Sequence, residues 1–118
     1  MPELLRQALA LDPADVVVRG RLIGFALDSA DYATHHLDES ILLCPVSEVR
    51  DAIALARSLI EAAPDAEPFQ HYLAEADQYE QMLNDWDEYQ LAKSGTFPEW
   101  CQAKGRSYSW CTHVYYNA

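Results

Sequence analysis

The sequence predicts a mainly α-helical fold, a compact antiparallel bundle of five or six helices with an extended aromatic C-terminal tail. Three observations lead to this prediction. Apolar residues recur at helical spacing in most segments, and prolines lie at the boundaries of several of those segments. Half of the 118 residues are apolar, which is enough for a chain of this length to bury a core as a single helical domain over residues 1–118.

The first helix is predicted over Pro2–Leu11, where leucines and alanines can share one face. It ends before Pro13, because a residue that precedes proline is disfavoured in the helical conformation. We expect Asp12 to be the N-cap of the next helix, with Pro13 at its first position and Asp15 in its first turn.

Two alternatives stand for residues 16–27. Three consecutive valines favour a strand, and Gly20 and Gly24 each cost a helix about 1 kcal/mol. The apolar residues alternate poorly, however, so we favour a helix in which the two glycines let a neighbouring element approach closely. A β-hairpin over residues 16–43 remains the alternative.

The next predicted elements are a turn at residues 28–31 and a helix over residues 32–43, which ends at Pro45. Ser47 is then expected to cap a helix over residues 48–63. The apolar residues of that helix share one face. They are Val49, Ala52, Ile53, Ala56, Leu59, Ile60 and Ala63.

The longest segment without an internal helix breaker covers residues 67–94 and predicts one long amphipathic helix. Its apolar residues follow at steps of four, three, four and three, and two more widen the stripe: Tyr72, Ala76, Tyr79, Leu83 and Trp86, with Phe69 and Leu73. The opposite side is polar and carries Asp77, Gln81, Asn84 and Glu88. Gly95 is expected to close this helix as a C-cap.

The composition changes in residues 93–118, which carry a net charge of +2 and six of the thirteen aromatic residues. Residues 97–104 predict a short helix, and residues 107–116 have an extended, strand-like composition. Two alternatives stand for the aromatic rings. They complete the core, or some of them stay exposed as a docking surface, since tryptophan and tyrosine are frequent interface anchors.

The net charge of −11 argues against direct binding to nucleic acid or to an anionic membrane, because both repel a polyanion. It fits a protein partner with a basic surface. No apolar run approaches the roughly eighteen residues that a membrane span needs, and the opening MPELLRQ lacks the features of a signal peptide. We therefore expect a cytoplasmic protein, and the sequence favours no particular oligomeric state.

Residues 7–32 carry a partial repeat pattern. ALALDP ends one helix, Leu22 and Gly24 lie in the next, and residues 30–32 (ADY) fall at an expected turn between helices. These features resemble tetratricopeptide repeats, although Arg19 stands where that family has an aromatic residue. The resemblance implies antiparallel helix pairs of about 34 residues per repeat and the binding of protein or peptide partners.

No nucleophile elbow, phosphate-binding glycine loop or dinucleotide fingerprint is present, so we expect no enzymatic activity and no cofactor. Asp31 and His35 are spaced to present two metal ligands on a helix, and Cys101 precedes Cys111-x-His113. Neither set is complete, so no metal site is predicted. The cysteines are expected to be free thiols in a reducing cytosol.

The acidic side of the long helix is the main functional candidate, since residues 67–92 hold seven carboxylates and neither lysine nor arginine. Such a face either only keeps the protein soluble or covers a basic surface on a partner. One helix imitates DNA sparsely, so further acids would have to contribute, namely Asp28, Asp31, Asp38 and Glu39. The predicted partner-binding residues are Glu75, Asp77, Glu80, Asp85, Asp87, Glu88, Trp100, Tyr108, Trp110 and Tyr115.

Three hypotheses for function follow. The first is a non-enzymatic inhibitor that covers a basic surface, including one that binds nucleic acid, as phage anti-defence and immunity-type proteins do. The second is a tetratricopeptide-like adaptor or chaperone that holds a peptide in a helical groove. The third is a small metal-dependent enzyme built on Asp31 and His35.

Overall fold

The computed structural model describes residues 2–92 and 95–108. Within these residues the chain forms five α-helices, two short 3₁₀ turns and no strand. The helices are α1 (Pro2–Leu11), α2 (Val16–Thr34), α3 (Val46–Glu61), α4 (Gln70–Ala92) and α5 (Phe97–Ala103), and the turns are η1 (Leu37–Glu39) and η2 (Glu67–Phe69). The predicted helical fold is confirmed, and the β-hairpin alternative for residues 16–43 is wrong.

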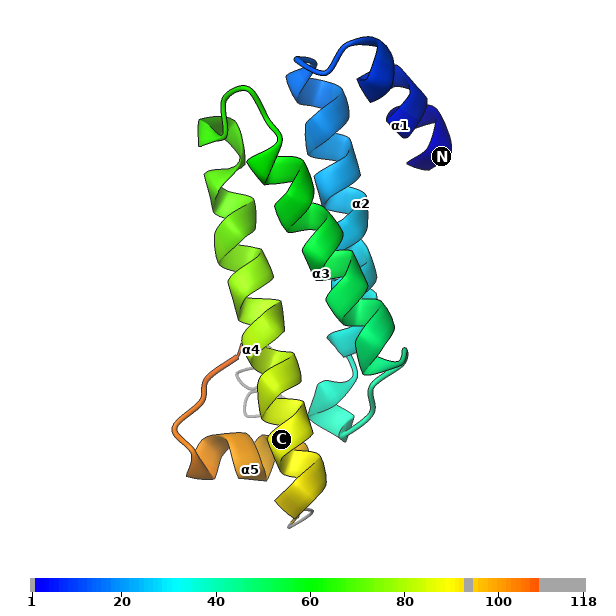
Figure 1. Cartoon of the computed structure of the whole chain (residues 1–118). Coiled ribbons are helices and arrows are strands. Elements are labelled where there is room, and N and C mark those ends of the chain that lie inside the picture. The colour runs from blue at the N-terminus through cyan, green and yellow to red at the C-terminus, as the bar shows by residue number, and fades with distance from the viewer. Residues whose placement is uncertain (1, 93–94, 109–118) are drawn as a thin grey trace.

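The three long helices α2, α3 and α4 lie side by side, each antiparallel to the next in sequence (Figure 1). Helix α1 packs along the N-terminal half of α2, and α5 crosses the far end of α4 (Figure 1). The bundle is elongated, with extents of 50 × 24 × 23 Å. Its radius of gyration is 16.1 Å, against about 13.5 Å for a globular chain of this length.

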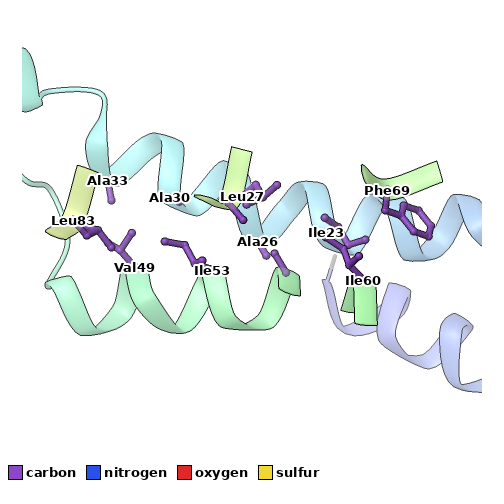
Figure 2. Packing of buried hydrophobic residues seen from close by; sticks show 12 residues of the cluster. Ile23, Ala26, Leu27, Ala30, Ala33, Val49, Ile53, Ile60, Phe69 and Leu83 are labelled. Carbon is purple, nitrogen blue, oxygen red and sulfur yellow. The ribbon is translucent and has the colours of Figure 1, made fainter. Parts of the chain in front are cut away.

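The main core fills the space between the three long helices. Figure 2 shows Ala26, Ala30 and Ala33 of α2 beside Val49 and Ile53 of α3. All five are buried, and the small alanine side chains allow the two helices to approach closely. The other buried members of this cluster are Ile23, Leu27, Ala56, Ile60, Phe69, Ala76 and Leu83.

A second core lies where α4 meets η1 and α5. Phe97 is fully buried, meets Trp86 edge-on at 5.2 Å between ring centroids, and stacks near Trp100 at 6.1 Å. The backbone N–H of Phe97 donates to Ser40 Oγ at 2.8 Å, which ties α5 to the end of η1. The other buried members are Leu37, Met82, Cys101 and Tyr108.

The buried Arg19 joins three segments of the chain. Its guanidinium donates to the carbonyl oxygens of Pro13 at 2.9 Å and Leu59 at 2.7 Å. Both acceptors are main-chain atoms, so the buried charge is hydrogen-bonded although no carboxylate takes part. Arg19 thereby fixes the α1–α2 turn and the C-terminal part of α3 against α2.

Several predicted boundaries near α2 are wrong. The N-cap is Asp15, whose side chain accepts from Val18 N–H at 3.1 Å, whereas Asp12 accepts only from Ala14 N–H within the turn. No turn occurs at residues 28–31, because α2 continues to Thr34 and buries alanines there in the core. The separate helix predicted over residues 32–43 is therefore wrong, since residues 32–34 are the end of α2 and only the η1 turn follows them before residue 43.

Smaller differences concern α3 and α4. Helix α3 begins at Val46 with Pro45 in the N-cap position, so Ser47 is not the cap. Residues 67–69 form the η2 turn before α4 begins at Gln70. Gly95 adopts a positive φ of 73°, the conformation expected of a glycine that ends a helix. Of the tail predicted to be extended, residues 109–118 lie outside the described part.

Core truncation tests this packing. Leu83→Ala removes a fully buried side chain between the three long helices, so it is expected to lower the free energy of unfolding by about 2–5 kcal/mol. Leu91→Ala is the matched control on the same helix, where the side chain is 90% exposed, and it should change stability by less than about 0.5 kcal/mol. Urea denaturation measures both. Equal losses would contradict the packing described.

The N-cap assignment has its own test. Asp15→Ala is expected to lower the free energy of unfolding by about 1 kcal/mol, because Val18 N–H then loses its acceptor. Asp12→Ala removes an exposed turn contact and should cost less. A larger loss for Asp12→Ala in urea denaturation would restore Asp12 as the cap.

Candidate functional site

The acidic side of α4 is partly neutralised by arginines of α3. Arg57 forms ion pairs with Asp77 at 2.7 Å and with Glu80 at 2.6 Å. Arg50 pairs with Asp87 at 2.8 Å. The hydrogen bond to Glu80, followed by that to Asp77, raises the pKa of Arg57. Three of the six acidic residues predicted to contact a partner are therefore paired with arginines of α3.

Asp85 is a core residue rather than a surface residue, being 2% exposed. Its carboxylate accepts hydrogen bonds from Arg106 Nε at 3.3 Å and from the hydroxyl of Tyr108. Burial, followed by the hydrogen bond to Asp85, raises the pKa of Tyr108. Asp85 thus holds the segment after α5 against α4, which corrects its prediction as a partner-binding residue.

The remaining predicted residues divide by exposure. Glu75 and Glu88 are exposed on α4. Trp100 and Tyr108 are 8% and 3% exposed in the second core, so the core alternative applies to these two rings. The last two predicted residues, Trp110 and Tyr115, lie outside the described residues.

A different group of carboxylates gathers around Tyr79, between α2 and α4. The Tyr79 hydroxyl donates to Asp31 Oδ1 at 3.1 Å. Burial raises the pKa of Tyr79, and the charges of Asp31, Glu75 and Asp28 raise it further. The three carboxylates are exposed, and α2 supplies two of them from successive turns. Asp28 and Asp31 are two of the acids that the sequence predicts to join the acidic side of the long helix in contacting a partner.

Large apolar side chains are exposed beside these carboxylates. Phe25 and Tyr32 of α2 are 45% and 60% exposed and lie seven residues apart, two helical turns along one face. We define the acidic α2 face as Phe25, Asp28, Asp31 and Tyr32 of α2 together with Glu75 of α4. Sequence reasoning missed its aromatic residues, although two rings flanking Asp28 at a spacing of seven were a detectable signal.

A groove of about 590 Å³ runs between α2 and α3 next to this face. Most of its lining is apolar, and its only charged residues are Asp28 and Glu48. The lining residues are Phe25, Asp28, Ser29, Tyr32, Cys44, Glu48, Val49 and Ala52. Two turns of α2 and one turn of α3 therefore line the groove mostly with apolar side chains, and Asp28 and Glu48 give it a negative charge.

The residues proposed for a metal enzyme have other partners. Asp31 accepts from Tyr79, and His35 Nδ1 lies 3.0 Å from the carbonyl oxygen of Tyr32. In the described part of the chain, one group of three potential ligands occurs around η1, with its atoms within 4.8 Å of one another: His36, Asp38 and Glu39. There the His36 ring is 2.8 Å from Glu39 Oε2. Cys101 is buried, while Cys111 and His113 lie outside the described residues.

None of the described helices is both long enough and apolar enough to cross a membrane. Comparison with protein-family models, with curated proteins and with solved structures finds no match to this chain. The site is therefore interpreted from its own geometry and charge.

Tyrosine titration tests the environments of Tyr79 and Tyr108. Both pKa values are raised above the ordinary value of about 10, so the neutral phenols stabilise the fold below that pH and the stabilisation is lost as pH rises above it. Between about pH 8 and 11, absorbance at 295 nm should show fewer phenolates in folded than in urea-denatured protein. Tyr79→Phe should reduce the tyrosinate absorbance change of the denatured protein and leave that of the folded protein unchanged. A reduced folded amplitude would contradict the described environment.

Proposed function

We propose that this protein is a non-enzymatic binding module that docks on a basic surface of a partner protein and inhibits the partner by covering that surface. The observation that carries the proposal is the distribution of its charge. Within the described residues, four of the nineteen acidic side chains pair with arginine, and all four lie on α4: Asp77, Glu80, Asp85 and Asp87. The carboxylates of the acidic α2 face are outside this set.

The basic side chains add to the asymmetry, because most of those described are engaged within the molecule. Arg19 binds main-chain carbonyls, and Lys104 lies 5.7 Å from the centre of the Trp100 ring. Arg50, Arg57 and Arg106 pair with α4. A protein whose positive charges are used internally presents a negative field to its surroundings, which attracts and orients a basic partner.

The proposed docking face lies mainly on α2, whereas the sequence predicts it on the long helix α4. The outward carboxylates of α4 were the first candidates, but the α3 arginines compensate several of them. The acidic α2 face combines charge with exposed aromatic rings, and both are needed, since electrostatics supplies orientation and buried rings supply affinity. If the basic surface of the partner binds nucleic acid, covering it would exclude the nucleic acid, as expected for an anti-defence or immunity-type protein.

One observation favours the second candidate function, an adaptor that holds a peptide. The groove between α2 and α3 is the kind of site into which a helical peptide packs its apolar face. The two candidates differ in what limits binding, because a peptide held mainly by apolar contacts resists salt and a charge-driven partner does not.

Neutralising the acidic α2 face tests the proposed function. The triple variant Asp28→Asn, Asp31→Asn, Glu75→Gln keeps side-chain shape and leaves an acceptor for Tyr79. Tagged protein is incubated with lysate of the native host at about 50 mM and about 500 mM salt, and bound proteins are quantified by mass spectrometry. Wild-type protein should capture a basic protein at low salt only, and the variant should capture about tenfold less of it.

The matched control removes the same number of charges at the α3–α4 turn. Glu61→Gln, Asp65→Asn, Glu67→Gln lies outside the proposed face, on exposed residues, and should capture the partner as wild type does. Equal capture by both triple variants and wild type, or a set of captured proteins without basic members, would refute the proposal.

A further inference from the structure

The groove between α2 and α3 has a shape that can receive one more helix. Its α2 wall is formed by Phe25, Ser29 and Tyr32, which follow at steps of four and three residues and so stand above one another. Its α3 wall is formed by Val49 and Ala52, three residues apart. The α2 wall is thus about two turns long and the α3 wall about one turn, and an interhelical groove of this kind can receive the apolar stripe of a third helix.

No residue of α1 lines the groove. Figure 1 shows α1 lying along the N-terminal half of α2 and ending there, so that the C-terminal half of α2 has no further helix on that side among the described residues. The groove lies along that C-terminal half. Cys44 lines the groove from the segment between η1 and α3, and the preceding Leu43 is 39% exposed. A contiguous exposed apolar surface of this kind marks an interaction site.

The charge of the groove selects its occupant. Asp28 and Glu48 stand on opposite walls, one from each helix, and the lining contains neither lysine nor arginine. A second copy of this chain is a poor occupant, because each copy carries a net charge of −11 and an acidic surface here. A helix with basic residues beside its apolar stripe matches both walls.

We infer that the α2–α3 groove binds an amphipathic helix of the partner, whose apolar stripe packs on Phe25, Tyr32 and Ala52 and whose flanking lysines or arginines face Asp28 and Glu48. This inference rests on the proposed function and names the element of the basic partner that is recognised. Binding would then place Glu75 and Asp31 against further basic residues of the partner, on the adjacent side of α2.

Three synthetic peptides of about 18 residues test the inference, a length sufficient for a helix that binding can stabilise. The first has a leucine stripe at helical spacing and lysines at the other positions. The second has the same composition with the stripe scrambled. The third keeps the stripe and replaces each lysine with glutamate. Titration into isotopically labelled protein is followed by the backbone amide resonances of Ser29, Val49 and Ala52.

The striped basic peptide is expected to shift these resonances and to bind about tenfold more tightly than either comparison peptide. Phe25→Ala removes the exposed ring on the groove wall and should weaken that binding about tenfold, whereas Leu91→Ala, on an exposed part of α4, should leave it unchanged. Both replaced side chains are exposed, so both variants are expected to fold.

The outcomes separate the inference from the proposed function. Equal binding of the striped and scrambled basic peptides, or unchanged binding by Phe25→Ala, would overturn the groove and leave a charge-driven module standing. Equal binding of the basic and acidic striped peptides would overturn the charge selection and support a purely apolar groove. Binding by neither basic peptide would overturn the groove inference alone, because the proposed function is tested separately by the capture of a basic protein.

Discussion

Two arginines of α3 span the contact between α3 and α4 and compensate part of the negative charge of α4. Arg57 contacts Asp77 and Glu80 of α4. Seven residues earlier, Arg50 contacts the side chains that follow seven residues later on α4, which are Asn84 and Asp87. The same contact therefore repeats after two turns of an antiparallel pair. Each exposed pair contributes little stability, but together they occupy carboxylates that would otherwise face a partner.

Helix α2 differs from α4, because its small residues lie on its inner side and its large rings Phe25 and Tyr32 lie on its outer side. Its inner face presents alanines to α3, and its Gly20 faces the η2 turn, where an added Cβ would lie 3.5 Å from the Phe69 ring. Close packing on that side leaves the larger Phe25 and Tyr32 on the outside, where burial would still be favourable. The helix that supplies many of the buried core residues thus also carries the exposed rings of the proposed docking face.

Local pattern predicted the helices α1, α3, α4 and α5, because the apolar spacing that identifies each of them lies within its own segment. It failed at residues 28–34, because Asp-Ser-Ala-Asp is typical of a turn and only the tertiary burial of Ala30 and Ala33 continues the helix. Sequence reasoning missed the internal pairing of the α4 carboxylates for a related reason. The carboxylates of α4 are visible in the sequence, but the arginines that pair with them come from another helix. In the sequence Asp85 resembles its exposed neighbours. Its burial involves the distant Tyr108, whose hydroxyl donates to the Asp85 carboxylate.

Charge and aromatic rings on the α2 face depend on each other. A net charge of −11 brings a basic partner near but selects no geometry, and its attraction is screened by salt. Exposed rings alone would favour association between copies of the chain. Carboxylates beside the rings oppose that self-association and at the same time attract a cationic partner, so the same residues provide solubility and selectivity. The proposed binding of a basic partner, rather than of a second copy, requires carboxylates and aromatic rings on the same face. Phe25, Asp28 and Tyr32 lie together on α2 and meet this requirement.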